Sequence, residues 1–186
     1  MNAADPWGLC KVKDGKLVEC KITRDKNLTK AEKKAADEFE KRLVEIGEAI
    51  NKSGNQDQID AFESIDEVVF SSTFQSPTGG AATASRNDDI DAVKKGKGTD
   101  ILTFYGQALG TGGTSDVAKQ VAGHEVEHFT QRDRDIHRMN SGNVFMERRA
   151  EIGTDTRAIG WMQKNGILPS PYTSGSSYTA GRVFRK

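Results

Sequence analysis

Residues 114–132 read TSDVAKQVAGHEVEHFTQR, and this stretch decides how the rest of the chain is interpreted. Its apolar spacing predicts a helix from about Asp116 to Arg132, with the hydroxyl of Thr114 or Ser115 as its N-cap. The chain has only three histidines, and two of them lie in this helix. We therefore expect the helix to carry a specialised site as well as packing surface.

The two histidines, His124 and His128, lie one turn apart on the same helix face, together with Val117 and Val121. Both imidazoles are therefore expected to point inward and to reach a single ion. Glu125 completes an HExxH motif and lies about a quarter turn away. Zinc held by such a pair lowers the pKa of a bound water, and a carboxylate beside it accepts the proton. The spacing predicts Zn²⁺ as cofactor and Glu125 as the catalytic base.

Composition excludes some other functions. The chain has 27 basic and 27 acidic residues, so it lacks the basic excess of a nucleic-acid-binding domain. No apolar stretch is long enough to cross a bilayer, and the N-terminus has no apolar signal core. We therefore expect no nucleic-acid partner, no membrane insertion and no Sec-type export encoded here.

The remaining pattern predicts an α+β fold of helices and a small sheet. Apolar residues at helical spacing follow Thr29, whose capping box with Glu32 begins a helix that Gly54 ends. We expect a hairpin at 9–21, strands at 67–75 and 101–105, a loop from 75 to about 87, and a final helix at about 145–164.

Two further sequence features are a pair of cysteines and a glycine-dense run. Cys10 and Cys20 flank the expected hairpin turn; one disulfide can join them, but the pattern favours free thiols. The glycine-dense run at 106–116 lacks the Gly-Lys-Ser/Thr ending of a phosphate loop, so nucleotide binding is not expected.

A catalytic zinc needs a third protein ligand. The metzincin arrangement requires Gly and His where this chain has Gln131 and Arg134, which excludes that class. His137 falls beyond the expected helix end and is a weak ligand candidate. It can instead bind substrate, stabilise an oxyanion, or be an ordinary surface histidine.

Three carboxylates on the last predicted helix are better candidates. Glu147, Glu151 and Asp155 follow one another at intervals of four residues and form one acidic stripe. A stripe of like charge is unfavourable unless a cation or basic neighbours neutralise it. The alternative is an ordinary solvated face, neutralised by Arg148, Arg149 and Arg157.

HExxH followed by Glu on a later helix resembles the gluzincin peptidases, in which the ligand lies in a Glu-x-x-Ala or Glu-x-x-x-Asp context. Residues 147–151, ERRAE, match the first form. The resemblance implies Glu147 as third zinc ligand with Glu151 behind a histidine; Glu151 as ligand with Asp155 behind it is the alternative. Gly153-Thr154-Asp155 is also similar to the aspzincin motif but lacks one residue of it.

The gluzincin resemblance also implies a zincin-like fold. In that fold an edge strand before the metal helix binds extended substrate by strand addition. Residues 101–105 are the natural candidate for this edge. A Tyr, His or Arg often polarises the oxyanion in such enzymes, which makes His137, Tyr172 and Tyr178 candidates.

Residues 2–9, NAADPWGL, resemble the end of the core region of RHS/YD-repeat proteins, N-x-x-D-P-x-G-L. The resemblance implies that residues 1–9 are a remnant of the RHS core and that 10–186 form a polymorphic-toxin domain. Such a domain travels inside its RHS shell as a secreted effector, enters a target cell, and has a cognate immunity protein.

Together these features predict a zinc endopeptidase toxin that cleaves a protein in the target cell. Two alternatives stay open at this point. One is a zinc amide or ester hydrolase that is not a peptidase. The other is a non-catalytic binding module in which a metal only stabilises the fold.

Overall fold

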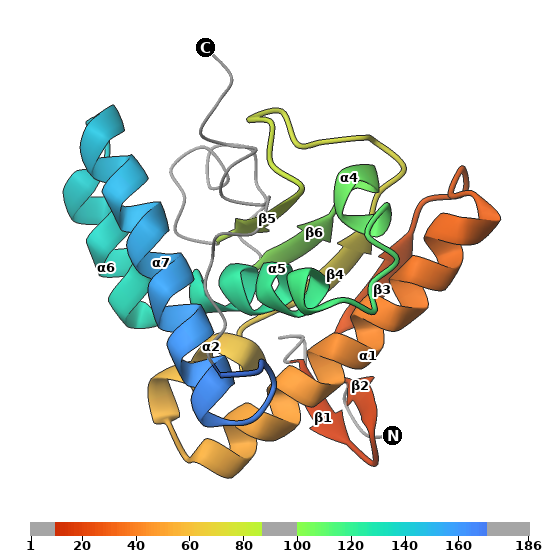
Figure 1. Cartoon of the computed structure of the whole chain (residues 1–186), viewed down its shortest axis with the longest axis horizontal. Coiled ribbons are helices and arrows are strands. Elements are labelled where there is room, and N and C mark those ends of the chain that lie inside the picture. The colour runs from red at the N-terminus through yellow and green to blue at the C-terminus, as the bar shows by residue number, and fades with distance from the viewer. Residues whose placement is uncertain (1–9, 87–99, 171–186) are drawn as a thin grey trace, which may run out of the picture.

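The computed structural model describes residues 10–86 and 100–170 as a mixed α+β fold (Figure 1). None of the helices in these two segments is long and apolar enough to span a membrane. The strands are β1 (Lys11–Lys13), β2 (Lys16–Val18), β3 (Lys21–Arg24), β4 (Glu67–Phe70), β5 (Ala82–Ser85) and β6 (Ile101–Phe104). The helices are α1 (Lys30–Ser53), α2 (Gln56–Glu63), α4 (Gly106–Leu109), α5 (Asp116–Glu127), α6 (Gln131–Asn140) and α7 (Val144–Lys164).

Four strands form the main sheet in the order β3-β4-β6-β5. β3, β4 and β6 are parallel, and β5 pairs antiparallel with β6 at one edge. We expected residues 101–105 to be this edge, and that expectation is wrong because β6 lies between β4 and β5. The true edge strand falls in the segment expected to be a loop, where Ala82 and Ala84 give little β-propensity.

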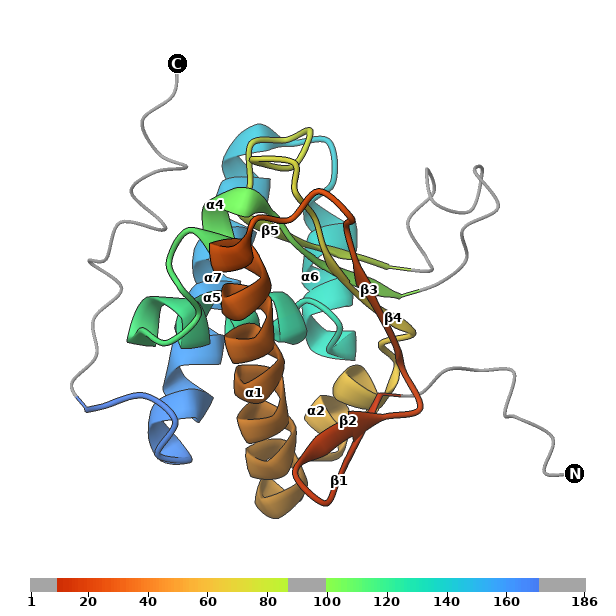
Figure 2. The ribbon, with the colours of Figure 1, turned by 90° about the vertical axis from the view of Figure 1, so that its right-hand side faces the viewer.

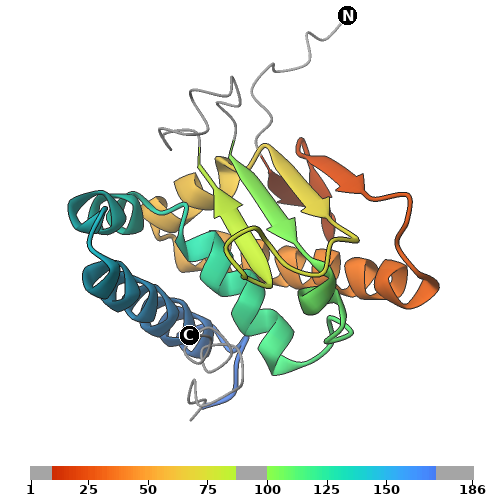
Figure 3. The same ribbon diagram turned by 90° about the horizontal axis from the view of Figure 1, so that it is seen from above.

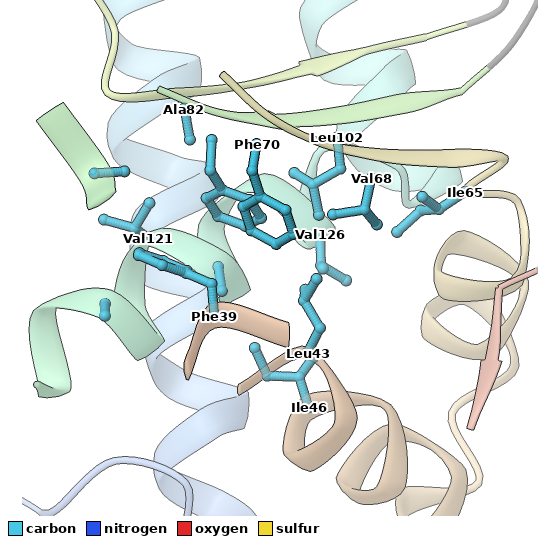
Figure 4. Packing of buried hydrophobic residues seen from close by; sticks show 14 of the residues in the cluster. Phe39, Leu43, Ile46, Ile65, Val68, Phe70, Ala82, Leu102, Val121 and Val126 are labelled. Atoms are coloured by element: carbon cyan, nitrogen blue, oxygen red, sulfur yellow. The ribbon is translucent and has the colours of Figure 1, made fainter. Parts of the chain in front are cut away.

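Helices α1 and α5 cover one face of the sheet (Figures 1 and 3). Alternate residues of β4 and β6 are buried on that face, and the ring of Phe104 lies 4.5 Å from that of Phe39 on α1. Figure 4 shows this core, in which Val121 and Val126 of α5 meet side chains from both α1 and the sheet. The metal-motif helix is thus fixed on a rigid sheet.

The N-terminal hairpin and α1 agree closely with the sequence. β1 and β2 pair across Asp14 and Gly15, both at positive φ, and lie beside α1 (Figure 2). Thr29 and Glu32 form the expected capping box, and Gly54 ends α1 in the left-handed conformation that glycine adopts without strain. The expectation of free thiols is wrong, because Cys10 and Cys20 form a disulfide.

Other boundaries differ from the prediction. β4 ends at Phe70 rather than 75, because the next residues turn away and Ser71 and Ser72 hydrogen-bond to Asp25. α2, which the sequence did not predict, begins at Asn55 as N-cap directly after α1.

The helix expected to run to Arg132 is two helices. α5 ends at Glu127, and Thr130 then accepts a hydrogen bond from the backbone N–H of Asp133 as the N-cap of α6. α6 and α7 form a helical hairpin beside α5 (Figure 3). His137, expected beyond a helix end, therefore lies on α6.

Candidate metal centre

The close packing of α5 against α7 builds the site. Gly123 faces Met162, and a Cβ on this glycine would lie 2.4 Å from the Met162 sulfur. The two helices are close enough for His124 to contact both Glu151 and Asp155 of α7. His124 is in the last turn of α5, and His128 is its C-cap.

Three potential ligand atoms meet between the helices. The Nε2 atoms of His124 and His128 lie 3.1 Å apart, and Oε2 of Glu151 is 3.4 Å and 3.6 Å from them, respectively. A tetrahedral zinc ion with bonds of about 2.0–2.1 Å holds its ligand atoms about 3.3–3.4 Å apart. The observed triangle has nearly these dimensions.

The other ring nitrogens are held by carboxylates. Nδ1 of His124 lies 3.1 Å from Asp155, and Nδ1 of His128 lies 2.8 Å from Asp133. Burial opposes ionisation of both carboxyls, but their hydrogen bonds to histidine hold each pKa below its usual value. An ionised carboxylate only accepts hydrogen bonds, so each Nδ1 carries the hydrogen that it donates.

This anchoring leaves the two Nε2 lone pairs facing each other across 3.1 Å. Neutral imidazoles in this arrangement repel one another unless a cation or a proton lies between them. A histidine whose second nitrogen donates to a carboxylate is also the usual arrangement around protein-bound zinc. The donor set therefore fits a zinc ion with two histidines and Glu151.

The charge balance favours a cation in the same place. Burial lowers the pKa of His128, but Asp133 and Glu151 outweigh it and raise that pKa to about 10. Burial raises the pKa of Glu151, but its contacts with the two histidines hold it well below the usual range. The carboxylates thus stabilise positive charge at the imidazoles, which either protons or a metal ion can supply.

The structure favours Glu151 over Glu147 as the third ligand. Oε1 of Glu147 accepts a hydrogen bond from the backbone N–H of Gly142 at 2.8 Å, one helical turn before Glu151. The choice of Glu147 as ligand does not fit this geometry, whereas the alternative with Glu151 as ligand and Asp155 behind His124 does. An i, i+4 stripe does not determine which of its members lies beside the histidines; in the structure that member is Glu151.

Asp133 is a residue of the candidate site that sequence reasoning missed. It is fully buried, and besides His128 it accepts hydrogen bonds from Thr154 at 2.6 Å and from Arg157. Arg157 also donates to Glu127 at 2.9 Å. The only sequence signal was the Thr-x-x-Asp spacing from Thr130, which predicts a helix start and so could have separated α6 from α5.

His128, Asp133 and His137 form a second group with metal-ligand chemistry. Asp133 is already paired with His128 and Arg157, and Arg86 lies 4.0 Å from it. A second cation would meet both guanidinium groups and would have to displace the hydrogen on His128. We therefore assign this group to support of His128.

A cleft of about 170 Å³ opens onto the metal ligands beside β5. Glu125, 2% exposed, lines it together with His128 and Glu151. The rest of the lining comes from the edge strand, the loop before it and α6: Thr78, Thr83, Ala84, Arg86 and His137.

His137 contributes a buried Nε2 that has no hydrogen-bond partner among the described residues. Burial lowers the pKa of this imidazole, which keeps it neutral near pH 7. The other two oxyanion candidates, Tyr172 and Tyr178, and the RHS-like residues 2–9 lie outside the described segments.

Comparisons with known proteins identify no relative: no family model, curated protein or solved structure matches this chain significantly. Function therefore has to be argued from the site itself.

Proposed function

We propose that this chain is a zinc-dependent endopeptidase with His124, His128 and Glu151 as zinc ligands. The observation that carries the proposal is the triangle of 3.1, 3.4 and 3.6 Å between two Nε2 atoms and a carboxylate oxygen. Both histidines are oriented through Nδ1, as in zinc proteins. A catalytic zinc with three protein ligands keeps a fourth position for water or substrate, and the adjoining cleft supplies the space.

Glu125 is the proposed general base. Zinc, when bound, lowers the pKa of a coordinated water and polarises a carbonyl oxygen. Glu125 follows His124 directly and lines the cleft, so its carboxylate can accept a proton from the attacking water and deliver it to the leaving amine. A metal site that only stabilised the fold would need no carboxylate in this position.

The edge strand supports a peptide as substrate. β5 is one of the two edge strands of the sheet, and Thr83 and Ala84 line the cleft. An extended peptide can pair with such an edge through backbone hydrogen bonds, which would carry its carbonyl past the metal ligands. This arrangement is the basis for proposing a zincin-like fold, with β5 in the role that we first gave to residues 101–105.

His137 is the proposed group for the substrate carbonyl oxygen. Its neutral imidazole faces the cleft from α6 and can donate a hydrogen bond to developing negative charge. This proposal replaces neither tyrosine candidate, since both lie outside the described residues.

The proposed biological role is that of a toxin effector, and it rests on the RHS-like residues 2–9. On this proposal the chain is released from its RHS shell, acts in a target cell, and is neutralised in the producer by an immunity protein.

The test compares wild type with Glu125→Gln in susceptible cells, by zinc content and by mass spectrometry of new protein termini. Glu125→Gln should keep zinc and fold while cleavage falls by about 10²–10⁴-fold, the usual contribution of a general base. Glu147→Gln is the matched control, because Glu147 caps a turn away from the ligands.

Each alternative predicts a different result. Toxicity that requires Glu125 without new protein termini would indicate another amide or ester hydrolase. Undiminished activity in Glu125→Gln would remove the catalytic claim and leave a binding module.

A further inference from the structure

The end of the α6–α7 hairpin exposes an unusual amount of apolar surface. Of the six large hydrophobic residues exposed in the described segments, five lie here, and only Phe74 lies elsewhere. We call this surface the hairpin end; its apolar members are Met139, Val144, Phe145, Met146 and Ile152. Phe145 is 83% exposed. Concentrated exposure of this kind marks an interaction site in a soluble domain.

The basic residues around the hairpin end are all arginines. Between residues 131 and 157 lie six of the chain's eleven arginines and none of its sixteen lysines. Arg148 and Arg149 are exposed on the first turns of α7, and neither forms an ion pair with another described residue. Protein–protein interfaces are enriched in arginine, methionine and phenylalanine and depleted of lysine. A surface that binds anionic lipid would carry lysine as readily as arginine, so this composition favours a protein partner.

The hairpin end also lies close to the cleft. Phe145 precedes Glu151 by six residues on α7, which is about 9 Å along the helix. Met139 follows His137, which lines the cleft, by two residues on α6. The cleft itself, at about 170 Å³, is smaller than the roughly 300–1,000 Å³ of a typical ligand pocket. On the proposed function, we therefore expect a protein substrate to contact the domain outside this cleft as well.

We propose that the hairpin end is an exosite that binds an apolar, acidic segment of the protein substrate. The inference rests on the proposed peptidase function and adds where substrate selectivity resides. The exposed Phe145 and its apolar neighbours bind the apolar part of that segment. Arg148 and Arg149, which form no ion pair with another described residue, pair with its carboxylates.

The experiment compares a protein target, identified from the new termini in cells, with a ten-residue peptide spanning its cleavage site. The variants are Phe145→Ser and the charge reversal Arg148→Glu/Arg149→Glu. Both should cut kcat/KM for the protein by at least about tenfold, the effect of an interface hot spot, and leave the peptide unchanged. Phe74→Ser, which removes another exposed phenylalanine, should leave both rates unchanged.

Other outcomes overturn the exosite. Equal loss on protein and peptide would mean that the hairpin end acts on the cleft itself, and no loss on either would mean that substrate does not contact it. Self-association in analytical ultracentrifugation, or binding to phosphatidylserine vesicles, that Phe145→Ser abolishes without affecting cleavage would assign the surface to a second copy or a lipid. A wild type that cleaves neither substrate would instead refute the peptidase function, and the exosite with it.

Discussion

The two ends of α7 have opposite characters. In its second half, Thr154, Asp155, Ala158 and Met162 are all buried to within 2% and pack on or hydrogen-bond to α5 and α6. In its first turn, Val144 and Phe145 are 77% and 83% exposed. One helix therefore supplies core at one end and exposed apolar surface at the other. Glu151 lies at the boundary, where a ligand can be both held by the core and open to substrate.

The same contrast between buried and exposed residues is found around the candidate metal centre. The carboxylates that orient the histidines come from buried positions, whereas the side chain of Glu151 remains 36% exposed. Rigid support behind the ligands keeps their geometry fixed. On the proposed function, exposure in front of them leaves room for a water molecule and a peptide.

The largest effect is expected from removing the carboxylate at the boundary, compared with removing the one a helical turn before it. Glu151→Ala should lower zinc affinity by more than about a hundredfold, because it removes a zinc ligand. Loss of a residue that only supports a ligand typically lowers affinity by about 10–100-fold. Glu147→Ala, one turn toward the exposed end, should leave affinity within about twofold. Competition titration with a chromophoric chelator measures both.

The opposite result, full zinc retention in Glu151→Ala and loss in Glu147→Ala, would place the ligand on the exposed turn. The comparison between the two ends of α7 would then fail at its central residue.

A second large effect is expected from pH. In the metal-free protein the pKa of His128 is raised to about 10, and that of His124 is also raised, by Asp155 and Glu151 against the effect of burial. Zinc must displace these protons, so its affinity should increase by up to about tenfold per pH unit for each proton released between pH 6 and 8. Calorimetry in buffers of different ionisation enthalpy counts the protons.

The stability of the metal-free protein should have the opposite slope. A folded-state pKa above the unfolded value of 6.5 stabilises the fold fully below pH 6.5, and this contribution is lost as pH rises toward about 10. The zinc-loaded protein should lack this alkaline loss. A zinc affinity that is flat with pH would show that protons do not occupy the metal position.

The sequence predicted the parts of the molecule that local chemistry determines. The α1 capping box, the Asp14-Gly15 turn and the spacing of His124 and His128 each depend on residues within a few positions of one another. Local patterns also predicted the start of α7 to within one residue. They predicted its end at Lys164 as well, where Asn165 and Gly166 stop the helix.

The parts that depend on distant contacts were not predictable in this way. β5 consists of small residues, and it becomes a strand only because β6 offers an edge. Asp133 supports His128 because Arg157 and Thr154 come from α7, more than twenty residues away. The choice between Glu151 and Glu147 depends on the axial position of α7 against α5, which all the contacts between the two helices determine together, that of Gly123 with Met162 among them.

The smallest effect distinguishes the inner face of α7 from its outer face. Gly123→Ala would bring a Cβ to 2.4 Å and 2.6 Å from the Met162 sulfur and methyl group, so α7 or the Met162 side chain must shift. We expect a loss of about 1–3 kcal/mol in unfolding free energy, as for an overpacked core. Because Met162 is flexible, the lower part of this range is expected, with weaker zinc binding from the displaced helix.

Gly160→Ala is the matched control on the outer face, where a Cβ meets no atom within 4 Å. This change should stabilise the helix by about 0.5–1 kcal/mol and leave zinc binding unchanged. Urea denaturation measures the change in unfolding free energy of both variants, a loss for Gly123→Ala and a gain for Gly160→Ala. Equal changes would mean that α5 and α7 are not in close contact at Gly123.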